Sequence, residues 1–286
     1  MSLRVGPAGW SYPDWAGTVY PEPKPRGFDP LRYLSGWFDA VEINSSFYRP
    51  PTPSMTAAWV RRVENNPNFR FTAKVWQRLT HEGSKDAQDV RAFLQGIEPL
   101  AEAARLGALL LQFPWSFKNT TEARERLEML ARLLRNFPLV VEVRHASWAD
   151  EGFYHFLRDL GIGFCNIDQP LIGQSLKPSS VVTSPAGYFR LHGRNMAWFT
   201  AGREERYNYL YTKEELAGFV PAVQSLAAGA GGGYVFFNNC HAGAAARNAL
   251  MMKQMLGLVE SLTPVQQAVV SGEGPGSLTS REPTIF

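Results

Sequence analysis

The sequence is poor in cysteine and has little excess charge of either sign. Its 286 residues contain two cysteines, Cys165 and Cys240, with no Cys-x-x-Cys spacing. Both fall in or beside predicted strands, where a small buried thiol is expected. A chain of this length buries a large core and needs neither a disulfide nor a metal for stability. The 29 basic and 26 acidic residues leave a formal charge of +3, so charge does not support nucleic acid as a partner.

Signals for export or membrane insertion are also missing. Residues Met1–Val5 lack the charged start and apolar run of a signal peptide. No apolar stretch approaches the roughly 20 residues of a membrane span. We therefore expect a cytoplasmic protein without a membrane partner.

What is present is an alternation of short β-rich segments with helical patterns. Such alternation predicts parallel strands joined by crossover helices. Eight strands of this kind form a (β/α)8 barrel of the TIM type, which typically takes roughly 250 residues. The strands are expected at Arg4–Trp10, Ala40–Asn44, Phe69–Val75, Ala108–Phe113, Leu139–Arg144, Ile162–Asp168, Tyr188–His192 and Tyr234–Asn238.

Capping residues locate the helices. Asp29-Pro30 and Thr52-Pro53 each supply an N-cap followed by proline in the first turn, and Asp150 begins a helix that Gly161 ends. No helical period occurs between Asp168 and Tyr188, so the crossover from strand six to strand seven should lack a regular helix. Further helices are expected at Asp86–Arg105, from Thr121 through Leu134, at Thr212–Leu226 and at Ala242–Leu262.

The chain is expected to form one domain. Residues 1–262 make up the barrel, and residues 263–286 form a Gly/Pro/Ser-rich C-terminal extension that contributes no core. The glycine-rich run at 229–233 precedes a strand, whereas a phosphate loop follows one. We interpret that run as a turn between a helix and a strand.

Polar residues within the predicted strands locate the candidate site. Strands of a barrel are covered on both faces and should be nearly all apolar, and successive side chains alternate between the faces. The apolar residues of each strand are assigned to the helix-facing side, so the polar ones should point into the barrel. The inward set is Glu42, Asn44, Thr72, Lys74, Gln112, Glu142, Arg144, Asn166, Asp168, Arg190, His192 and Asn238.

This inward set predicts a functional pocket. Barrel enzymes place their sites at the carboxyl ends of the strands, and buried ion pairs are a costly way to gain stability alone. We expect Glu42 and Glu142 to act as acid–base groups, and Lys74 to stabilise an oxyanion or act as a base. Asp168 and His192 complete the candidate catalytic set.

The charges of the set argue against a metal. Three carboxylates face three fixed cations, whereas a divalent-metal site would show a surplus of carboxylates and imidazoles. We therefore expect no cofactor. The alternative is a divalent metal held by Glu42, Glu142, Asp168 and His192.

The loops after the strands suggest a ligand that is anionic or sugar-like. They carry Trp10, Trp15, Trp76, Trp115, Trp148 and Trp198, and flat rings that line a cleft suit sugars or bases. The alternative is that these rings fill a loop core. The arginines near strand seven, with the amides of Asn239–Gly243 at a helix start, favour an anion. The candidate ligand-binding residues are Trp10, Asn44, Tyr48, Gln112, Arg144, Arg190, Arg194 and Asn238.

Several segments in order along the chain carry a family resemblance. They are Gly9–Tyr12, Val41–Arg49, Lys74, Thr80-His81, Gln112–Pro114, Glu142–His145, Arg190–Arg194 and Phe236–Asn239. Together they resemble the YecE-like family, domain of unknown function 72 (DUF72). The resemblance runs from about Arg4 to Val259 and implies a TIM-type barrel, often with an incomplete set of helices. The family brings no established reaction.

Three functions remain open on these residues. The first is an enzyme acting on a phosphate-bearing sugar or nucleotide, with a phosphodiester hydrolase as one form. The second is a glycosidase that uses Glu42 and Glu142, although pairing each with a cation lowers its pKa where a general acid needs the opposite. The third is a non-catalytic binder of a small anionic ligand.

Overall fold

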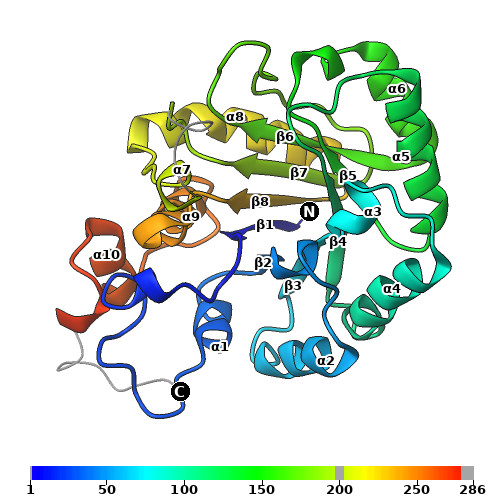
Figure 1. The fold of residues 1–286 in the computed structure, drawn as a ribbon. Coiled ribbons are helices and arrows are strands. Elements are labelled where there is room, and N and C mark those ends of the chain that lie inside the picture. The colour runs from blue at the N-terminus through cyan, green and yellow to red at the C-terminus, as the bar shows by residue number, and fades with distance from the viewer. Residues whose placement is uncertain (1, 197–202, 278–286) are drawn as a thin grey trace.

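The computed structural model describes residues 2–196 and 203–277 of the chain. Eight parallel strands form a nearly closed barrel with helices around it (Figure 1). The predicted (β/α)8 architecture and its strand positions are confirmed to within a few residues. The strands are β1 (Ser2–Pro7), β2 (Ala40–Ile43), β3 (Arg70–Lys74), β4 (Leu106–Gln112), β5 (Leu139–Glu142), β6 (Ile162–Asp168), β7 (Ala186–Leu191) and β8 (Gly232–Phe237).

The barrel closes through a short seam between β1 and β2. The hydrogen-bonded order runs from β1 through β8, β7 and onward to β2. At the seam only an isolated bridge joins Ala8 to Glu42, and the Gly9 amide donates to the Glu42 carbonyl at 2.9 Å. A Cβ at Gly6 would lie 1.9 Å from the Ala40 carbonyl oxygen. The absence of a side chain at Gly6 therefore permits the approach of the two strands.

Helices follow most strands and begin at the expected caps. The side chains of Asp29, Thr52 and Asp150 each accept hydrogen bonds from backbone amides in the first turn. The helices are α1 (Pro30–Ser35), α2 (Pro53–Arg62), α3 (Gln77–Thr80), α4 (Ala87–Glu102), α5 (Thr121–Leu133), α6 (Glu151–Leu160), α7 (Arg203–Arg206), α8 (Lys213–Gly229), α9 (Ala244–Met255) and α10 (Pro264–Ser271). No helix of the described residues has both the length and the apolar character needed to cross a bilayer.

The crossover between β6 and β7 contains no helix, as predicted. The buried side chain of Asn166 organises it instead. Its amide nitrogen donates to the carbonyls of Val181 (2.9 Å) and Tyr188 (3.3 Å), and its oxygen accepts from the Val181 amide (2.8 Å) and the Ser179 hydroxyl (2.7 Å). Asn166 therefore satisfies backbone groups that a helix would satisfy internally.

The expectation that the chain after Thr263 contributes no core is wrong. Thr263 and Gln266 form a capping box that begins α10, and Val269 is fully buried in the core that covers β1 and β8. The helix expected through Leu262 ends at Met255. Residues 278–286 of the predicted extension lie outside the described residues.

Candidate functional site

Strand register assigns the inner face of the barrel. Glu42 pairs with Thr72, Gln112 with Glu142, and Arg190 with Phe236. Neighbours in a parallel ladder point to the same face, and Tyr188, two residues before Arg190, donates to Glu42 at 2.8 Å across the interior. The residues that share this inner face at the carboxyl ends are Glu42, Lys74, Gln112, Glu142, Arg144, Arg190, His192 and Asn238.

Arg190 lies at the centre of this set. Its Nη2 donates to Glu42 Oε1 at 2.7 Å, and its Nη1 forms a short contact with Glu142 Oε2. All three side chains have 0% exposure. The two carboxylates on opposite sides of one guanidinium fix its plane. Both terminal nitrogens are held by the protein's own carboxylates, whereas Nε has no partner among the described residues. The binding of a ligand by Arg190 stays a prediction.

Glu142 also holds the next layer of side chains toward the opening. Its Oε1 accepts from Arg144 Nε (3.0 Å) and Nη2 (2.8 Å), and it lies 3.2 Å from His192 Nε2. The Asn238 amide nitrogen lies 3.0 Å from His192 Nδ1. His192 Nε2 also lies 3.3 Å from Arg144 Nη2 and 3.4 Å from Arg190 Nη1. Both ring nitrogens of His192 therefore lie within hydrogen-bond distance of polar groups of the inner face.

The pKa shifts in this layer follow from burial and charge. Burial alone would raise the pKa of Glu142, but Arg190, His192 and Arg144 hold it well below its usual range. Burial lowers the pKa of His192 to about 3, assisted by Arg144 and Arg190 against the opposing effect of Glu142. At neutral pH Glu142 is therefore an anion and His192 a neutral imidazole.

Lys74 differs from the other charged residues of the inner face. Its side chain is half-buried at the end of β3, with Nζ 4.5 Å from the centre of the Phe47 ring. Within residues 2–196 and 203–277, no hydrogen bond or ion pair to Nζ occurs. Burial, followed by the charge of Arg190, lowers its pKa to about 7, although Glu42 and Glu142 oppose the shift.

Two side-chain amides lie at the ends of neighbouring elements of the site. Gln112 ends β4 on the inner face, and Asn44 follows β2 and precedes a short helical turn at Ser45–Phe47. Gln112 and Asn44 are both half-buried, and Asn44 Oδ1 accepts no hydrogen bond from the described residues. Amide groups of this kind donate and accept hydrogen bonds equally well, as hydroxylated ligands require.

The placement of Asp168 on the inner face is wrong. Cys165 pairs with Tyr188 and Ile167 with Arg190, so Asn166 and Asp168 point to the helix-facing side. There Asp168 accepts from Arg194 Nε (2.9 Å) and from the Tyr211 hydroxyl (2.6 Å). Burial raises the pKa of Asp168, while the hydrogen bonds from Arg194 and Tyr211 oppose that rise.

Some of the donors expected to hold an anion beside β7 and β8 have partners within the chain. Arg194 binds Asp168 and also Glu215 at 3.1 Å. The Ala242 amide at the helix start donates to Asp14 at 2.7 Å. Binding of a phosphate by this region stays a prediction.

The aromatic residues divide between core and rim. Trp15 and Trp148 are fully buried and donate to the carbonyls of Cys240 and Phe117 at 2.7 Å, so these two fill a loop core. Trp10 is half-buried and packs edge-on against Trp59 at 5.2 Å. Tyr48 is 54% exposed on the loop after β2. Trp198 lies outside the described residues.

The four residues named for a metal do not converge. Asp168 lies on the outer face, and Glu42 and Glu142 are bound by guanidinium groups. Among the residues described, no group of three or more His, Cys, Asp and Glu side chains is arranged to hold a metal ion.

His81 is a site residue that the interpretation of the strands missed. Its ring packs against Phe47 at 5.0 Å, on which Lys74 also packs, and its Nδ1 lies 3.0 Å from the Thr80 hydroxyl. Burial, together with the nearby charges of Lys74 and Arg126, lowers its pKa to about 4. His81 follows α3 and lies outside the strands, so strand alternation says nothing about it. The signal in the sequence that pointed to it was the Thr80-His81 pair within the family resemblance.

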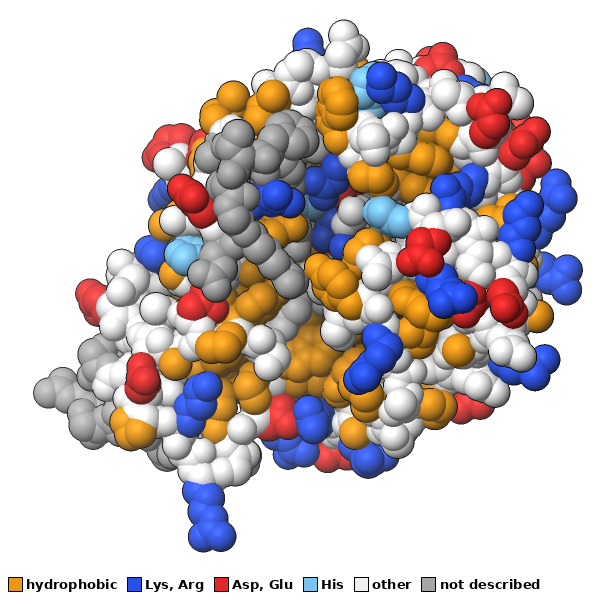
Figure 2. Space-filling view, in the orientation of Figure 1, with side chains coloured by type: hydrophobic (Ala, Val, Ile, Leu, Met, Phe, Trp, Pro, Cys, Tyr) orange, Lys and Arg blue, Asp and Glu red, His pale blue; other side chains and the backbone are white. Residues whose placement is uncertain are grey.

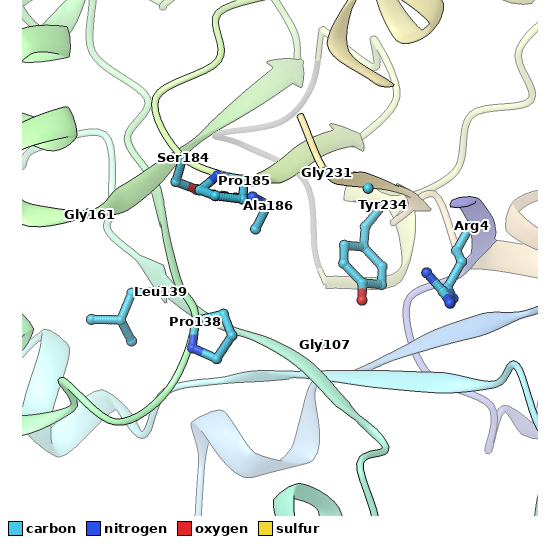
Figure 3. A pocket seen from close by; sticks show the side chains of 11 residues that line it. Arg4, Gly107, Pro138, Leu139, Gly161, Ser184, Pro185, Ala186, Gly231 and Tyr234 are labelled. Atoms are coloured by element: carbon cyan, nitrogen blue, oxygen red, sulfur yellow. Dashed lines mark hydrogen bonds between the residues drawn. The ribbon is translucent and has the colours of Figure 1, made fainter. Parts of the chain in front are cut away.

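The molecule is hollowed at both ends. The face in Figure 2 has a central depression with basic and histidine side chains inside and hydrophobic side chains beside it. A separate hollow of about 410 Å³ lies at the amino-terminal ends of the strands, lined in part by Arg4, Leu139, Pro185 and Tyr234 (Figure 3). That end of a barrel normally serves stability, whereas the carboxyl end carries chemistry.

Comparison with known proteins agrees with the fold. The model of the family described as "Protein of unknown function DUF72" matches residues 4–269, which include most of α10. A DUF72 family protein from Thermotoga maritima MSB8 has a TM-score of 0.79 and 38% identity, covering 90% of this chain and 100% of that chain. One from Enterococcus faecalis V583 also has a TM-score of 0.79, with 29% identity and coverage of 92% and 98%. UPF0759 protein YunF of Bacillus subtilis (strain 168) is 28% identical, covering 92% of this chain and 98% of its own length. This chain therefore belongs to the DUF72 family.

Proposed function

We propose that the protein is an enzyme that acts on a small, anionic, sugar-like molecule, with Lys74 as its acid–base group. One observation carries the proposal. Every other charged side chain of the inner face is held in an ion pair, whereas Lys74 Nζ has no such partner among the described residues. A pKa of about 7 allows Lys74 to accept and release protons at neutral pH.

The ligand class follows from charge and hydrogen-bonding capacity. Glu42 and Glu142 neutralise Arg190 and Arg144, so a protonated Lys74 leaves one positive charge uncompensated. A carboxylate or phosphate ester would balance that charge. Gln112 and Asn44 supply polar groups for hydroxyls, and Phe47 supplies an apolar surface.

The same geometry disfavours the glycosidase alternative. A glycosidase needs one carboxylic acid that reaches the glycosidic oxygen in its protonated form. Glu42 and Glu142 are both fully buried and bound to Arg190, and the pKa of Glu142 is lowered. We assign Glu42, Glu142, Arg190 and His192 the role of positioning the site and setting its charge. A phosphodiester hydrolase that uses Glu42 and Glu142 as acid and base meets the same objection.

Calorimetric titration with ribose 5-phosphate and with gluconate tests the ligand class, and ribose serves as the neutral control. The wild type should bind at least one of the two anions more tightly than ribose. Lys74→Met should weaken that binding at least about tenfold, the lower end of what a charge-assisted hydrogen bond contributes. Lys85→Met, at an exposed lysine, should leave the affinity unchanged.

Proton NMR of the same mixtures over hours separates enzyme from binder. Conversion by the wild type that is lost in Lys74→Met supports the proposal. Tight binding without any conversion favours the non-catalytic alternative. Equal binding by the wild type and Lys74→Met, or no binding of either anion at millimolar concentration, would overturn it.

A further inference from the structure

We infer that Lys74 acts as a nucleophile and forms an imine with an aldehyde or ketone carbon of the ligand. The inference deepens the proposed function, because it gives the same amine a covalent role and names carbonyl compounds as the substrate class. It rests on the position of Nζ, on its lack of partners among the described residues and on the imidazole beside it.

The position of Nζ suits attack on a bound molecule. Lys74 is the last residue of β3 and points to the inner face at the end of the barrel where ligands bind. Phe47 covers one side of the ammonium group at 4.5 Å. The side chain is half-buried, so it is accessible to a ligand while much of its stem is held by the protein.

Lys253, a buried lysine elsewhere in the fold, shows the contacts that a structural lysine makes. Lys253 is 5% exposed, and its Nζ donates to the Trp37 carbonyl at 2.7 Å and to Asp39 at 3.2 Å. Lys74 has no comparable partners within the described part of the chain. Holding an ammonium group in such a place costs stability, and a reactive amine is a reason to keep it there.

The surroundings increase the fraction of free amine. Burial and Arg190 lower the pKa of Lys74 to about 7, so about half of the amine is unprotonated at pH 7. An ordinary lysine with a pKa near 10.4 is unprotonated in only about 0.04% of molecules at that pH. Desolvation and a neighbouring cation are the two means by which proteins activate a lysine for imine formation.

His81 is placed to move the protons that imine formation requires. Its ring contacts Phe47 from the side of α3, and the Thr80 hydroxyl bonds its Nδ1. Its pKa of about 4 keeps the ring neutral at pH 7. No partner of Nε2 occurs among the described residues, so this nitrogen is left to exchange a proton with a reacting oxygen.

The reaction balances without an external oxidant or reductant. The Nζ lone pair attacks the carbonyl carbon, and the proton that nitrogen loses moves to the former carbonyl oxygen to give a carbinolamine. That hydroxyl then leaves as water after taking the second proton of the nitrogen, and the carbon–nitrogen double bond forms. Addition of water reverses both steps and regenerates the free amine.

Borohydride trapping tests the inference. The protein is incubated at pH 7 with dihydroxyacetone phosphate, which has both a ketone and an anionic group, and sodium borohydride is then added. Hydride transfer to the imine carbon gives a stable secondary amine, and peptide mass mapping locates it. The wild type should carry one adduct at Lys74, and its trapping rate should rise with pH through a midpoint near 7.

Three variants complete the experiment. Lys74→Arg should give no adduct, Lys85→Met should react like the wild type, and His81→Gln should react at Lys74 at least about tenfold more slowly. Adducts spread over surface lysines without preference for Lys74 would overturn the inference. Calorimetric binding of dihydroxyacetone phosphate without any adduct would overturn the imine but leave the acid–base role standing. Neither binding nor adduct would overturn both.

Discussion

Lys74 and Arg190 present like charges to the same inner face of the barrel, but only Arg190 has carboxylate partners there. Arg190 is bound by Glu42 and Glu142. No carboxylate of the described residues pairs with Lys74. The charge of Arg190 is one of the causes of the lowered pKa of Lys74. Glu42 and Glu142 thus stabilise the charged form of Arg190. The charge of Arg190 in turn destabilises the protonated form of Lys74.

The first prediction is that Lys74→Met stabilises the protein at acidic pH. The pKa of Lys74 falls from 10.5 to about 7 on folding. Below pH 7 Lys74 is charged in both the folded and the unfolded protein. The cost of keeping that charge in the folded protein then lowers the free energy of unfolding by its full amount. Between pH 7 and 10.5 only the unfolded chain holds that proton, so wild-type stability rises with pH across this window.

Urea unfolding of the wild type and Lys74→Met at pH 6, 8 and 10 measures this effect. The gain in unfolding free energy should be largest at pH 6 and should shrink toward pH 10. Lys85→Met should change stability by less than about 0.5 kcal/mol at each pH. A Lys74→Met variant that is less stable than the wild type at pH 6 contradicts the prediction.

The second prediction concerns Arg190. Arg190→Met leaves Glu42 and Glu142 buried without a shared cation and should cost about 3–5 kcal/mol of unfolding free energy. Adding Glu42→Gln and Glu142→Gln to Arg190→Met should recover much of that loss, because the buried charges are then gone. The exposed pair Arg32–Glu64 is the control, and Arg32→Met should cost less than about 1 kcal/mol. A triple variant no more stable than Arg190→Met would show that packing, not charge, causes the loss.

The third prediction is a loss of stability in mild acid that originates at His192. Its pKa is about 3 in the folded protein and 6.5 in the reference state. As pH falls below 6.5, His192 binds a proton in the unfolded chain but stays neutral in the folded protein. One such group lowers stability by up to about 1.4 kcal/mol per pH unit, and His81 contributes in the same direction.

The test measures the free energy of unfolding between pH 6.5 and pH 5. In this range the histidines of the unfolded chain titrate, whereas most carboxylates do not. His192→Gln keeps a polar group beside Glu142 but removes the ring, so the slope of stability against pH should fall by about one proton. An unchanged slope in His192→Gln would exclude His192 as a source of the dependence.

The strands and the inner cluster were predictable because period-two alternation and apolar faces reflect burial directly. On β6 this reasoning failed. Phe164 packs against Tyr154 of α6 on the outer face, while Cys165 and Ile167 point inward. The polar residues of β6, Asn166 and Asp168, therefore lie on its outer face, and polarity identified the wrong face as the inner one. Asn166 finds its partners in the loop after β6, and strand periodicity does not reveal such partners.

The C-terminal segment was misjudged for another reason. Residues 263–286 are rich in Ser, Gly, Pro and Thr as a whole, and this composition conceals the short apolar helix α10. The capping pair Thr263 and Gln266 was the local signal for that helix. Lys74 was found by strand position, but its lack of an ionic partner depends on the three-dimensional arrangement of Arg190, Glu42 and Glu142.

The last prediction concerns Asn166, which takes the place of a crossover helix. Asn166→Ala removes both hydrogen bonds to the backbone of the half-buried Val181 and leaves its amide and carbonyl without their side-chain partner. Each lost hydrogen bond contributes about 0.5–1.5 kcal/mol, so the total should be about 2 kcal/mol. Amide exchange at Val181 should accelerate strongly, whereas exchange at Leu110, in the β4 ladder, should follow only the change in global stability.

Ser179→Ala is the matched control. It removes one bond to the same Asn166 oxygen but keeps the Val181 pair, so it should cost less than about 1.5 kcal/mol. If Val181 exchanges at the same rate in the wild type and in Asn166→Ala, the crossover is held by its other contacts and Asn166 is not its anchor.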